Sequence, residues 1–279
     1  MKFELEHLGV KYRGDLDAAT SLAIGLDFDG PQPNHFGTEP ASRQPLQFGD
    51  FVGNTQQGGC CNVDVIELIP HCNGTHTESA GHIVDDDVFV GSMASQAWYP
   101  AIVLTMQPVP ARETKETYRP KFELDDWVIG SQMLKQAFQQ YASLRPSALI
   151  IRTLPNDGSK SSRVYDEQSK PPFFSIEAMQ FINQMEIQHL LVDMPSVDRM
   201  YDDGLLTCHH VYWNVPEGTH RVTDDSWKDK TISEMIFVPD RIEDGFYLLN
   251  LQVPAFFTDA APSRPILFPC QPVGPAIAR

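Results

Sequence analysis

The chain has 279 residues, of which 42% are hydrophobic and 10% aromatic, so its length and composition allow a sizeable core. Its formal charge of −16 disfavours nucleic acids and anionic membranes as partners, because both are polyanions that repel an acidic surface. We therefore expect a small-molecule partner.

The start of the chain gives no sign of a targeting segment. Its first residues, MKFELEH, alternate charged and apolar side chains and lack the apolar stretch of a signal peptide. No later segment approaches the roughly 20 apolar residues of a membrane span. The five cysteines are an odd number and include the adjacent pair Cys60 and Cys61, which rules out a complete disulfide framework. These features predict a protein of the reducing cytoplasm.

Short apolar segments predict a sheet with helices between its strands. Ser175 is a typical N-cap for a helix that runs through Met185, and residues 127–144 place apolar side chains at helical spacing. Proline-rich polar loops are expected at 107–120 and 155–172, and neither need be a domain boundary. Strands rich in β-branched or large apolar residues are expected at 63–69, 101–106, 148–153, 189–193 and 246–251, where they would form a sheet core.

These elements indicate a mixed α/β class in one domain over residues 1–279. Their order is irregular, which fits poorly with a doubly wound sheet or an eight-fold barrel. Glycine-rich nucleotide-binding patterns are absent from the sequence, so nucleotide cofactors have little support.

The segment 71–82, HCNGTHTESAGH, concentrates groups that can bind a metal. It holds three of the nine histidines, together with Cys72 and Glu78, around a flexible Asn-Gly pair. Imidazole and carboxylate suit zinc, manganese or iron, and a catalytic site needs three or four such ligands with one position open. His76 and Glu78 would project to the same side of an extended segment. A single histidine is usually a hydrogen-bonded surface or core residue, but packing alone does not explain this cluster.

A second group of polar residues lies far along the chain. The segment 192–198, VDMPSVD, leads to His209 and His210, which follow Cys208, and Glu234 comes later. On its own a His-His pair is more often structural, and a glutamate on an amphipathic segment is usually a surface charge. Joined to segment 71–82, these residues could complete a metal site.

Together these segments resemble the putative cyclase family, which includes bacterial kynurenine formamidase and isatin hydrolase and carries the pattern HxGTHxDxPxH. The Gly-Thr-His match ends at His76, His82 follows six positions later as in the family, and Glu78 stands where the family has aspartate. VDMPSVD is similar to the family's VDTxSxD. Cys208 and the two histidines after it are similar to the family's Ala-His-His. Glu234 is similar to its late ligand glutamate. The resemblance spans the chain from about Gly49 onward.

The resemblance implies a swivelling β/β/α fold and homo-oligomers, dimers or tetramers, whose neighbouring subunits help to shape the site. It implies a metal-dependent amidohydrolase that cleaves the C–N bond of a small amide, formamide or lactam with metal-activated water. His82 would donate and accept the proton. The implied ligands of one or two divalent ions, zinc or manganese, are His71, His76 and Glu78 for one and Glu78, His209 and Glu234 for the other.

The first ligand departs from the family's spacing. His71 lies five residues before His76 where the family has four, and Cys72 occupies the family's position. Either a one-residue bulge at the Asn-Gly pair lets His71 reach the metal, or the Cys72 thiolate replaces it and favours a softer metal such as zinc. We favour His71, because glycine makes the loop adjustable.

Two further departures bear on the shape of the pocket. Ala80 replaces the family's proline, and the stretch from His210 to Glu234 is longer than in the family. This insert carries Tyr212, Trp213 and Trp227, which would line or cover the substrate site or else belong to the core or an interface. The substrate's identity cannot be transferred across such changes.

Other classes of function are open to the same residues. A non-catalytic metal-binding protein is one, although the carboxylates count against a closed structural zinc site. A metal-assisted cyclase or lyase would use the same centre for enolate chemistry. A cysteine-dependent hydrolase is disfavoured, because adjacent residues such as Cys208 and His209 point to opposite faces of a strand.

Overall fold

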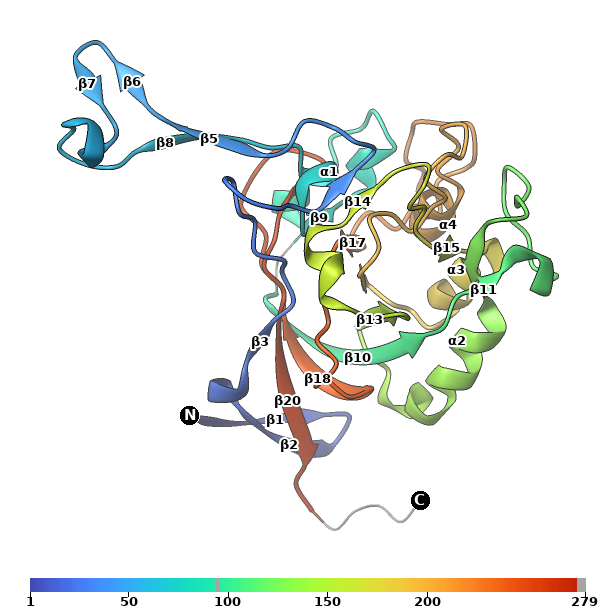
Figure 1. Ribbon diagram of the computed structural model, residues 1–279. Helices are drawn as coiled ribbons and strands as arrows, with labels where there is room; N and C mark the ends of the chain where they lie inside the picture. The colour runs from blue at the N-terminus through green and yellow to red at the C-terminus, as the bar shows by residue number, and fades with distance from the viewer. Residues whose placement is uncertain (94–95, 275–279) are drawn as a thin grey trace.

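The fold is organised around one large mixed sheet. The computed structural model describes residues 1–93 and 96–274 of the chain. The sheet's strands are β1 (Lys2–His7), β2 (Val10–Asp15), β3 (Thr20–Ser21), β9 (His76–Glu78), β10 (Trp98–Met106), β13 (Ala148–Thr153), β16 (His189–Val192), β17 (Thr231–Glu234), β18 (Gly245–Asn250), β19 (Ala260–Pro262) and β20 (Ile266–Pro272). Their order is β1-β2-β20-β18-β10-β13-β16-β17-β9-β19, with β3 on β20 (Figure 1).

The centre of this sheet is parallel and buried on both faces. β10, β13, β16 and β17 pair in parallel, and every residue of β13 is buried. Alternate residues of β10 enter different clusters: Ile102 and Leu104 pack on one face of the sheet, Ala101 and Val103 on the other. The strands predicted at 101–106, 148–153, 189–193 and 246–251 are confirmed as β10, β13, β16 and β18.

Helices cover one face of the central strands (Figure 1). They are α2 (Ser131–Phe138), α3 (Ile176–Gln184) and α4 (Thr207–Trp213), which contribute to the larger core cluster, whereas the single turn α1 (Pro70–Asn73) lies beside β19. α3 confirms the predicted cap, because Ser175 Oγ accepts a hydrogen bond from the Ala178 N–H. None of the helices in the described residues is both long and apolar enough to cross a bilayer.

The helix predicted at 127–144 is wrong at its start. Its first residues form a strand, β12, whose Val128 and Ile129 are buried and pair with Phe173 and Phe174. The helix begins only after Gly130, where the Glu116 carboxylate accepts hydrogen bonds from the N–H and hydroxyl of Ser131. β-branched residues followed by glycine favour a strand that ends in a helix start, and the helical spacing of the later residues hid that change.

Shorter elements surround the main sheet. The small sheets are β11 (Val109–Pro110) with β12 (Trp127–Ile129) and β15 (Phe173–Phe174), β4 (Asn34–His35) with β14 (Val164–Tyr165), β5 (Ser42–Pro45) with β8 (Asp64–Glu67), and β6 (Gln47–Phe48) with β7 (Phe51–Val52). The 3-10 helices are η1 (Leu16–Ala18), η2 (Thr55–Gln57), η3 (Ala80–His82), η4 (Val90–Ser92), η5 (Ala111–Glu113), η6 (Gln139–Leu144) and η7 (Gly158–Ser162). The predicted mixed α/β class is confirmed.

Residues 42–67 form an arm that projects from the rest of the molecule (Figure 1). β5 pairs with β8 along its length, β6 with β7 near its end, and all four residues of β8 are exposed. The prediction that 63–69 belongs to the sheet core is therefore wrong, although a strand forms at 64–67. Apolar patterning reports that a segment suits a strand, and it does not report which sheet that strand joins.

Candidate metal centre

The strand β9 presents two side chains to one buried site. His76 and Glu78 are fully buried and lie on the same side of the strand, as its alternation predicts. Thr77 points the other way and binds the hydroxyls of Ser233 and Ser263. β9 lies between β17 and β19, so each of its two neighbours brings its own residues to the site.

Two buried atoms of this strand lack partners among the described residues. His76 Nδ1 lies 3.0 Å from the Gly74 carbonyl, which turns Nε2 into the site, and Nε2 has no hydrogen-bond partner. Glu78 Oε2 is also buried without one. Leaving a buried polar atom unpaired costs about 1–3 kcal/mol, so two such atoms in one site call for a ligand. An imidazole nitrogen and a carboxylate oxygen together fit a divalent metal.

Glu234 comes from the neighbouring strand β17. The antiparallel register sets Glu234 opposite His76, and its Oε2 lies 3.5 Å from His76 Nε2. Its other oxygen accepts a hydrogen bond from the Val197 N–H at 2.9 Å, which fixes the carboxylate. The predicted ligand Glu234 therefore lies inside the site, in a buried strand and not on an exposed amphipathic segment.

His209 reaches the Glu78 carboxylate from helix α4. Its Nε2 lies 3.0 Å from Glu78 Oε1, and its Nδ1 lies 2.5 Å from Asp198 Oδ2. Asp198 is buried and also accepts hydrogen bonds from the Cys208 and His209 N–H groups at the start of α4 and from the Tyr118 hydroxyl. One carboxylate thus fixes both the helix start and the orientation of the imidazole.

Charge balance holds this group together without a metal. Burial would raise the pKa of Glu78, but the imidazoles of His82 and His209 outweigh it and hold the pKa well below its usual range. Burial would lower the pKa of His209, but Glu78 and Asp198 outweigh it and raise the pKa well above its ordinary value. A metal cation would replace the protons that these buried carboxylates attract.

His71 enters the site from the opposite side. Its Nδ1 lies 3.1 Å from Glu78 Oε2, without hydrogen-bond geometry, and its Nε2 lies 2.7 Å from Asp259 Oδ2. The extra residue before His76 is taken up by the single helical turn α1 and by Gly74 at φ +154°, a conformation that other residues rarely adopt. No β-bulge is needed. Cys72 is buried and its thiol interacts with Thr38.

The geometry therefore favours His71 over Cys72 as the first ligand. Ligand atoms of His71, His76 and Glu78 all lie within 4.8 Å of one another, and Cys72 belongs to no such group in the described residues. Burial also raises the pKa of the Cys72 thiol, which disfavours the thiolate that a metal requires.

His82 lies on the short helix η3, directly after β9. Ser79 caps this turn: its hydroxyl accepts from the Gly81 N–H and donates to the Val88 carbonyl. The ring of His82 stacks on that of His71 at 4.1 Å between centroids and lies 5.4 Å from that of His209. The structure thus brings together all six residues predicted for the site: His71, His76, Glu78, His82, His209 and Glu234.

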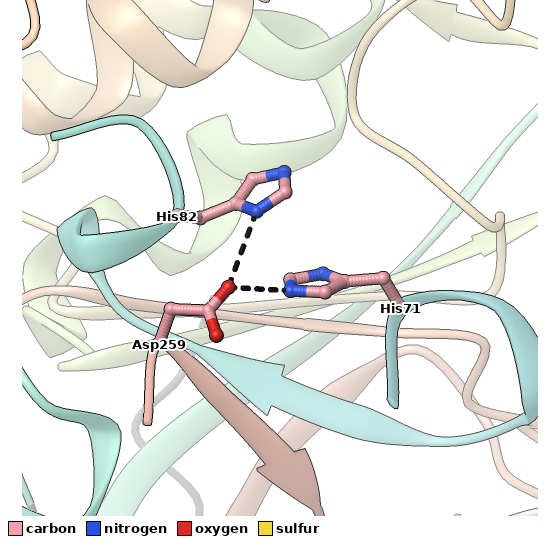
Figure 2. A group of neighbouring side chains, drawn as sticks. All are labelled: His71, His82 and Asp259. Atoms are coloured by element: carbon pink, nitrogen blue, oxygen red, sulfur yellow. Dashed lines mark hydrogen bonds and ion pairs between the residues drawn. The ribbon is translucent and has the colours of Figure 1, made fainter. Parts of the chain in front are cut away.

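Asp259 is a site residue that the sequence analysis missed. Its carboxylate faces one edge of both the His71 and the His82 ring, with Oδ2 2.7 Å from His71 Nε2 and 3.4 Å from His82 Nδ1 (Figure 2). Hydrogen bonds from His71 and His82 hold the pKa of Asp259 below its usual range. Asp259 follows His71 by 188 residues, and only the pairing of β19 with β9 brings it here. No sequence motif marked it.

Cys208 is unsuited to nucleophilic catalysis, although not for the reason expected. It lies on helix α4, not on a strand, and its thiol donates to the Phe174 carbonyl at 3.3 Å. Complete burial, followed by the nearby Asp198 carboxylate, raises the pKa of this thiol well above its ordinary value. The thiolate that a cysteine-dependent hydrolase needs is therefore strongly disfavoured.

The insert after His210 has two distinct parts. Tyr212 and Trp213 are fully buried core residues of α4, which decides for the core between the alternatives that the sequence left open. The later part reaches the loop after His82, where the Asp85 N–H donates to the His220 carbonyl and the Val222 N–H to Asp86. This second part, and not the two aromatic residues, contacts the loop that follows His82.

Comparisons with known proteins agree on the fold. The family model described as "Putative cyclase" matches residues 20–199, and no curated protein matched the sequence. Isatin hydrolase A from Labrenzia aggregata, bound to benzyl benzoate, has a TM-score of 0.62 and 14% identity over 90% of this chain and 93% of that one. The isatin hydrolase A of Ralstonia solanacearum has a TM-score of 0.60 and 17% identity over 90% and 91%.

A third similar structure is described as a predicted metal-dependent hydrolase from Bacillus stearothermophilus. Its TM-score is 0.56, with 14% identity over 90% of this chain and 97% of that one. At these identities the similarity establishes the fold. The chemistry has to be argued from the residues of the site.

Proposed function

The chain belongs to the putative cyclase family, and from this premise we propose that it is a metal-dependent hydrolase that cleaves the C–N bond of a small amide, formamide or lactam. The observation that carries the proposal is the pair of buried atoms that make no hydrogen bond among the described residues, His76 Nε2 and Glu78 Oε2. Similar structures are described as metal-dependent hydrolases and isatin hydrolases, which supports the same class.

We propose zinc or manganese as the divalent metal. His71, His76 and Glu78 would hold one ion, and Glu78, His209 and Glu234 would hold a second. Mixed imidazole and carboxylate ligands suit either metal and argue against a closed structural zinc site. Such a metal supplies activated water, by lowering its pKa towards about 7, and polarises the substrate carbonyl.

His82 is the residue proposed to carry the proton. Its Nδ1 is turned towards Asp259, and its second nitrogen lies on the far side of the ring (Figure 2). An imidazole can accept a proton from the attacking water and return it to the departing nitrogen. Its ring lies beside those of His71 and His209, two of the proposed metal ligands.

Access to the site supports a small substrate. The side chains of His71 and His82 are 24% and 26% exposed and that of Asp259 is 42% exposed, whereas Glu78 is fully buried. A substrate would therefore approach over His71, His82 and Asp259, and its carbonyl would point inward to Glu78 and His76.

Turnover with and without metal tests this function. Protein stripped with a chelator and then loaded with Zn²⁺ or Mn²⁺ is assayed on panels of aryl formamides, lactams and lactones. We expect metal-dependent hydrolysis of a formamide or lactam. Elimination or ring closure would support the metal-assisted cyclase or lyase instead. Full metal loading with no turnover on any panel would support a non-catalytic metal-binding protein.

The arm formed by residues 42–67 supports a homo-oligomer, which we propose as the working form of the protein. Phe48 is 81% exposed and Ile66 53% exposed, and the strand that carries each pairs with only one other strand of the arm. Isolated two-stranded hairpins are marginally stable, and apolar strands that project from a domain invite pairing with another chain. A second copy of the chain would cover the arm.

Light scattering tests the role of the arm. Replacing both Phe48 and Ile66 by serine should shift an oligomer towards monomer. Leu124→Ser is the matched control, because Leu124 is 82% exposed outside the arm. A wild-type protein that is monomeric at micromolar concentration, or an oligomer that the double variant leaves intact, would contradict the proposal.

The thiols at the end of the arm support a reducing compartment, and we propose the cytoplasm. Cys60 and Cys61 are exposed and free, with their sulfur atoms 3.8 Å apart. Adjacent residues have Cα atoms about 3.8 Å apart, closer than the roughly 4.4 Å or more of most disulfides. Rapid alkylation in freshly lysed cells should therefore label both thiols; a disulfide there would contradict this location.

A further inference from the structure

The carboxylate of Asp259 joins two imidazoles with different proposed roles. The same oxygen, Oδ2, lies 2.7 Å from Nε2 of His71 and 3.4 Å from Nδ1 of His82 (Figure 2). Neither the resemblance nor the comparisons assign this residue a role. Its side chain is 42% exposed, so packing alone gives no reason to hold a carboxylate at this point.

The backbone around Asp259 is fixed on both sides. The Ser79 N–H donates to the Asp259 carbonyl at 2.9 Å, and the register of β19 sets Ala260 opposite Glu78. On the preceding residue, the Thr258 carbonyl accepts from the Val90 N–H at 2.8 Å. The carboxylate is therefore presented from a rigid position beside the strand that carries His76 and Glu78.

A second carboxylate in the same site shows what such a position does. Asp198 lies behind His209: it binds Nδ1, and the opposite nitrogen, Nε2, faces Glu78. Asp259 lies behind His71 in the same sense, because it binds Nε2 and the opposite nitrogen, Nδ1, faces Glu78. Carboxylates that accept the second N–H of an imidazole fix its tautomer and orient the first nitrogen towards a metal.

We infer that Asp259 is a positioning residue that orients His71 for the metal and His82 for proton transfer through one carboxylate oxygen. The inference rests on the proposed function for the role of His82, but not for the orientation of His71. When a metal displaces the proton of Nδ1, accepting the His71 Nε2–H would keep Nδ1 unprotonated and directed towards Glu78 Oε2. Accepting the His82 Nδ1–H leaves Nε2 of His82 as the nitrogen that exchanges a proton with the substrate.

Metal titration of stripped protein tests the first half without any turnover. Asp259→Ala should weaken Zn²⁺ or Mn²⁺ binding by about 10- to 100-fold, the usual effect of removing such a partner. Asp259→Asn keeps an acceptor oxygen and should weaken it less. The matched control is Asp87→Asn, which removes an exposed carboxylate from the loop after His82. In a His71→Ala background the effect of Asp259→Ala should vanish, because its target is gone.

Two results of the titration would overturn the inference. Unchanged affinity in Asp259→Ala would show that His71 is oriented without it. A loss of metal as complete as in His76→Ala would make Asp259 a direct ligand, since His71, His82 and Asp259 also offer atoms within 4.8 Å of one another. Circular dichroism confirms that each variant is folded, and Asp259→Asn, nearly identical in shape, gives the comparison if the alanine variant is not.

Steady-state kinetics at saturating metal test the second half. Asp259→Ala should lower kcat by at least tenfold with little change in KM, and the same change made in a His82→Ala background should have no further effect on kcat. Additive losses in the two variants would refute action through His82. If the wild type binds metal and turns over no substrate, the proposed function fails while the titration still decides the role of Asp259.

Discussion

The two sides of the candidate metal centre differ in how firmly the fold holds them. The buried side consists of His76, Glu78, His209 and Glu234, which come from β9, α4 and β17 and are almost inaccessible to solvent. The open side consists of His71, His82 and Asp259, which come from single turns or the end of a loop and are partly exposed. Regular, buried elements suit the retention of a metal, and the open side suits contact with a substrate.

This difference predicts that substitutions on the two sides have different effects. On the buried side, each imidazole has one nitrogen tied to a fixed acceptor, the Gly74 carbonyl for His76 and Asp198 for His209. On the open side, His71 and His82 share the single exposed acceptor Asp259. Substitutions on the buried side should therefore affect metal content and stability. On the open side, His82 substitutions should affect turnover alone, whereas those at His71 and Asp259 should also weaken metal binding.

The largest expected difference is between His76→Ala and His82→Ala. Removing His76 takes away the buried nitrogen that lacks another partner, so this variant should lose nearly all its metal and its activity. His82→Ala should keep its metal while turnover falls about 10²- to 10⁴-fold, the usual contribution of a general acid or base. Metal analysis of protein purified without added metal, beside activity assays, measures both.

A control separates these effects from general loss of histidine. His7→Ala removes an imidazole that contacts the Leu144 carbonyl far along the chain from segment 71–82, and it should change neither quantity. Equal metal loss in His76→Ala and His82→Ala would make His82 an ordinary ligand. The distinction between the two sides would then disappear.

The next largest difference is between the two carboxylates that orient imidazoles. Asp198→Ala removes the buried acceptor of His209 and of the N–H groups at the start of α4, and should lower the free energy of unfolding by about 3–5 kcal/mol. Asp259→Ala removes a partly exposed partner. Because solvent screens its ion pairs, this loss should lower the free energy of unfolding by about 1 kcal/mol or less. Urea unfolding of the metal-free variants measures both values. Similar losses would show that burial does not distinguish the two positions.

Part of this centre could be predicted from the sequence because it depends on local geometry. His76 and Glu78 are two residues apart, and alternation along a strand places them on one side wherever that strand lies. The helix after Ser175 was equally local, since its cap and apolar spacing lie within a few residues. The assignment of ligand roles to His209 and Glu234 came from resemblance, and it stays a prediction until metal is measured.

Other features depended on contacts between distant segments. Asp259 meets His71 only because β19 pairs with β9 in one register, and sequence spacing contains no record of that pairing. The strand at 64–67 has an apolar pattern that suits a core, yet it lies on the arm, where its neighbours within the chain are few. The sequence left Trp213 open between the pocket, the core and an interface, because a large aromatic side chain suits any of them, and the structure packs it in the core.

A further expected difference concerns pH and the proton on His71. Burial alone would lower the pKa of His71, but Asp259 and Glu78 outweigh it and raise the pKa to about 10, against 6.5 in the unfolded chain. Because the folded, metal-free protein binds this proton more tightly, the resulting stability is complete below about pH 6.5 and is lost as the pH rises towards 10. A bound metal displaces the proton, so the metal-loaded protein should not show this decline.

Urea unfolding between about pH 6 and pH 10 measures this decline, with His71→Gln as the control. The metal-free wild type should lose stability as the pH rises, whereas metal-free His71→Gln should lose less, because the titrating imidazole is absent. Metal affinity of the wild type should increase over the same range, since the ion no longer competes with a proton. If the free energy of unfolding falls equally with pH in the wild type and the variant, the titrating proton is not on His71. The open side would then give the substrate access to the site without binding this proton.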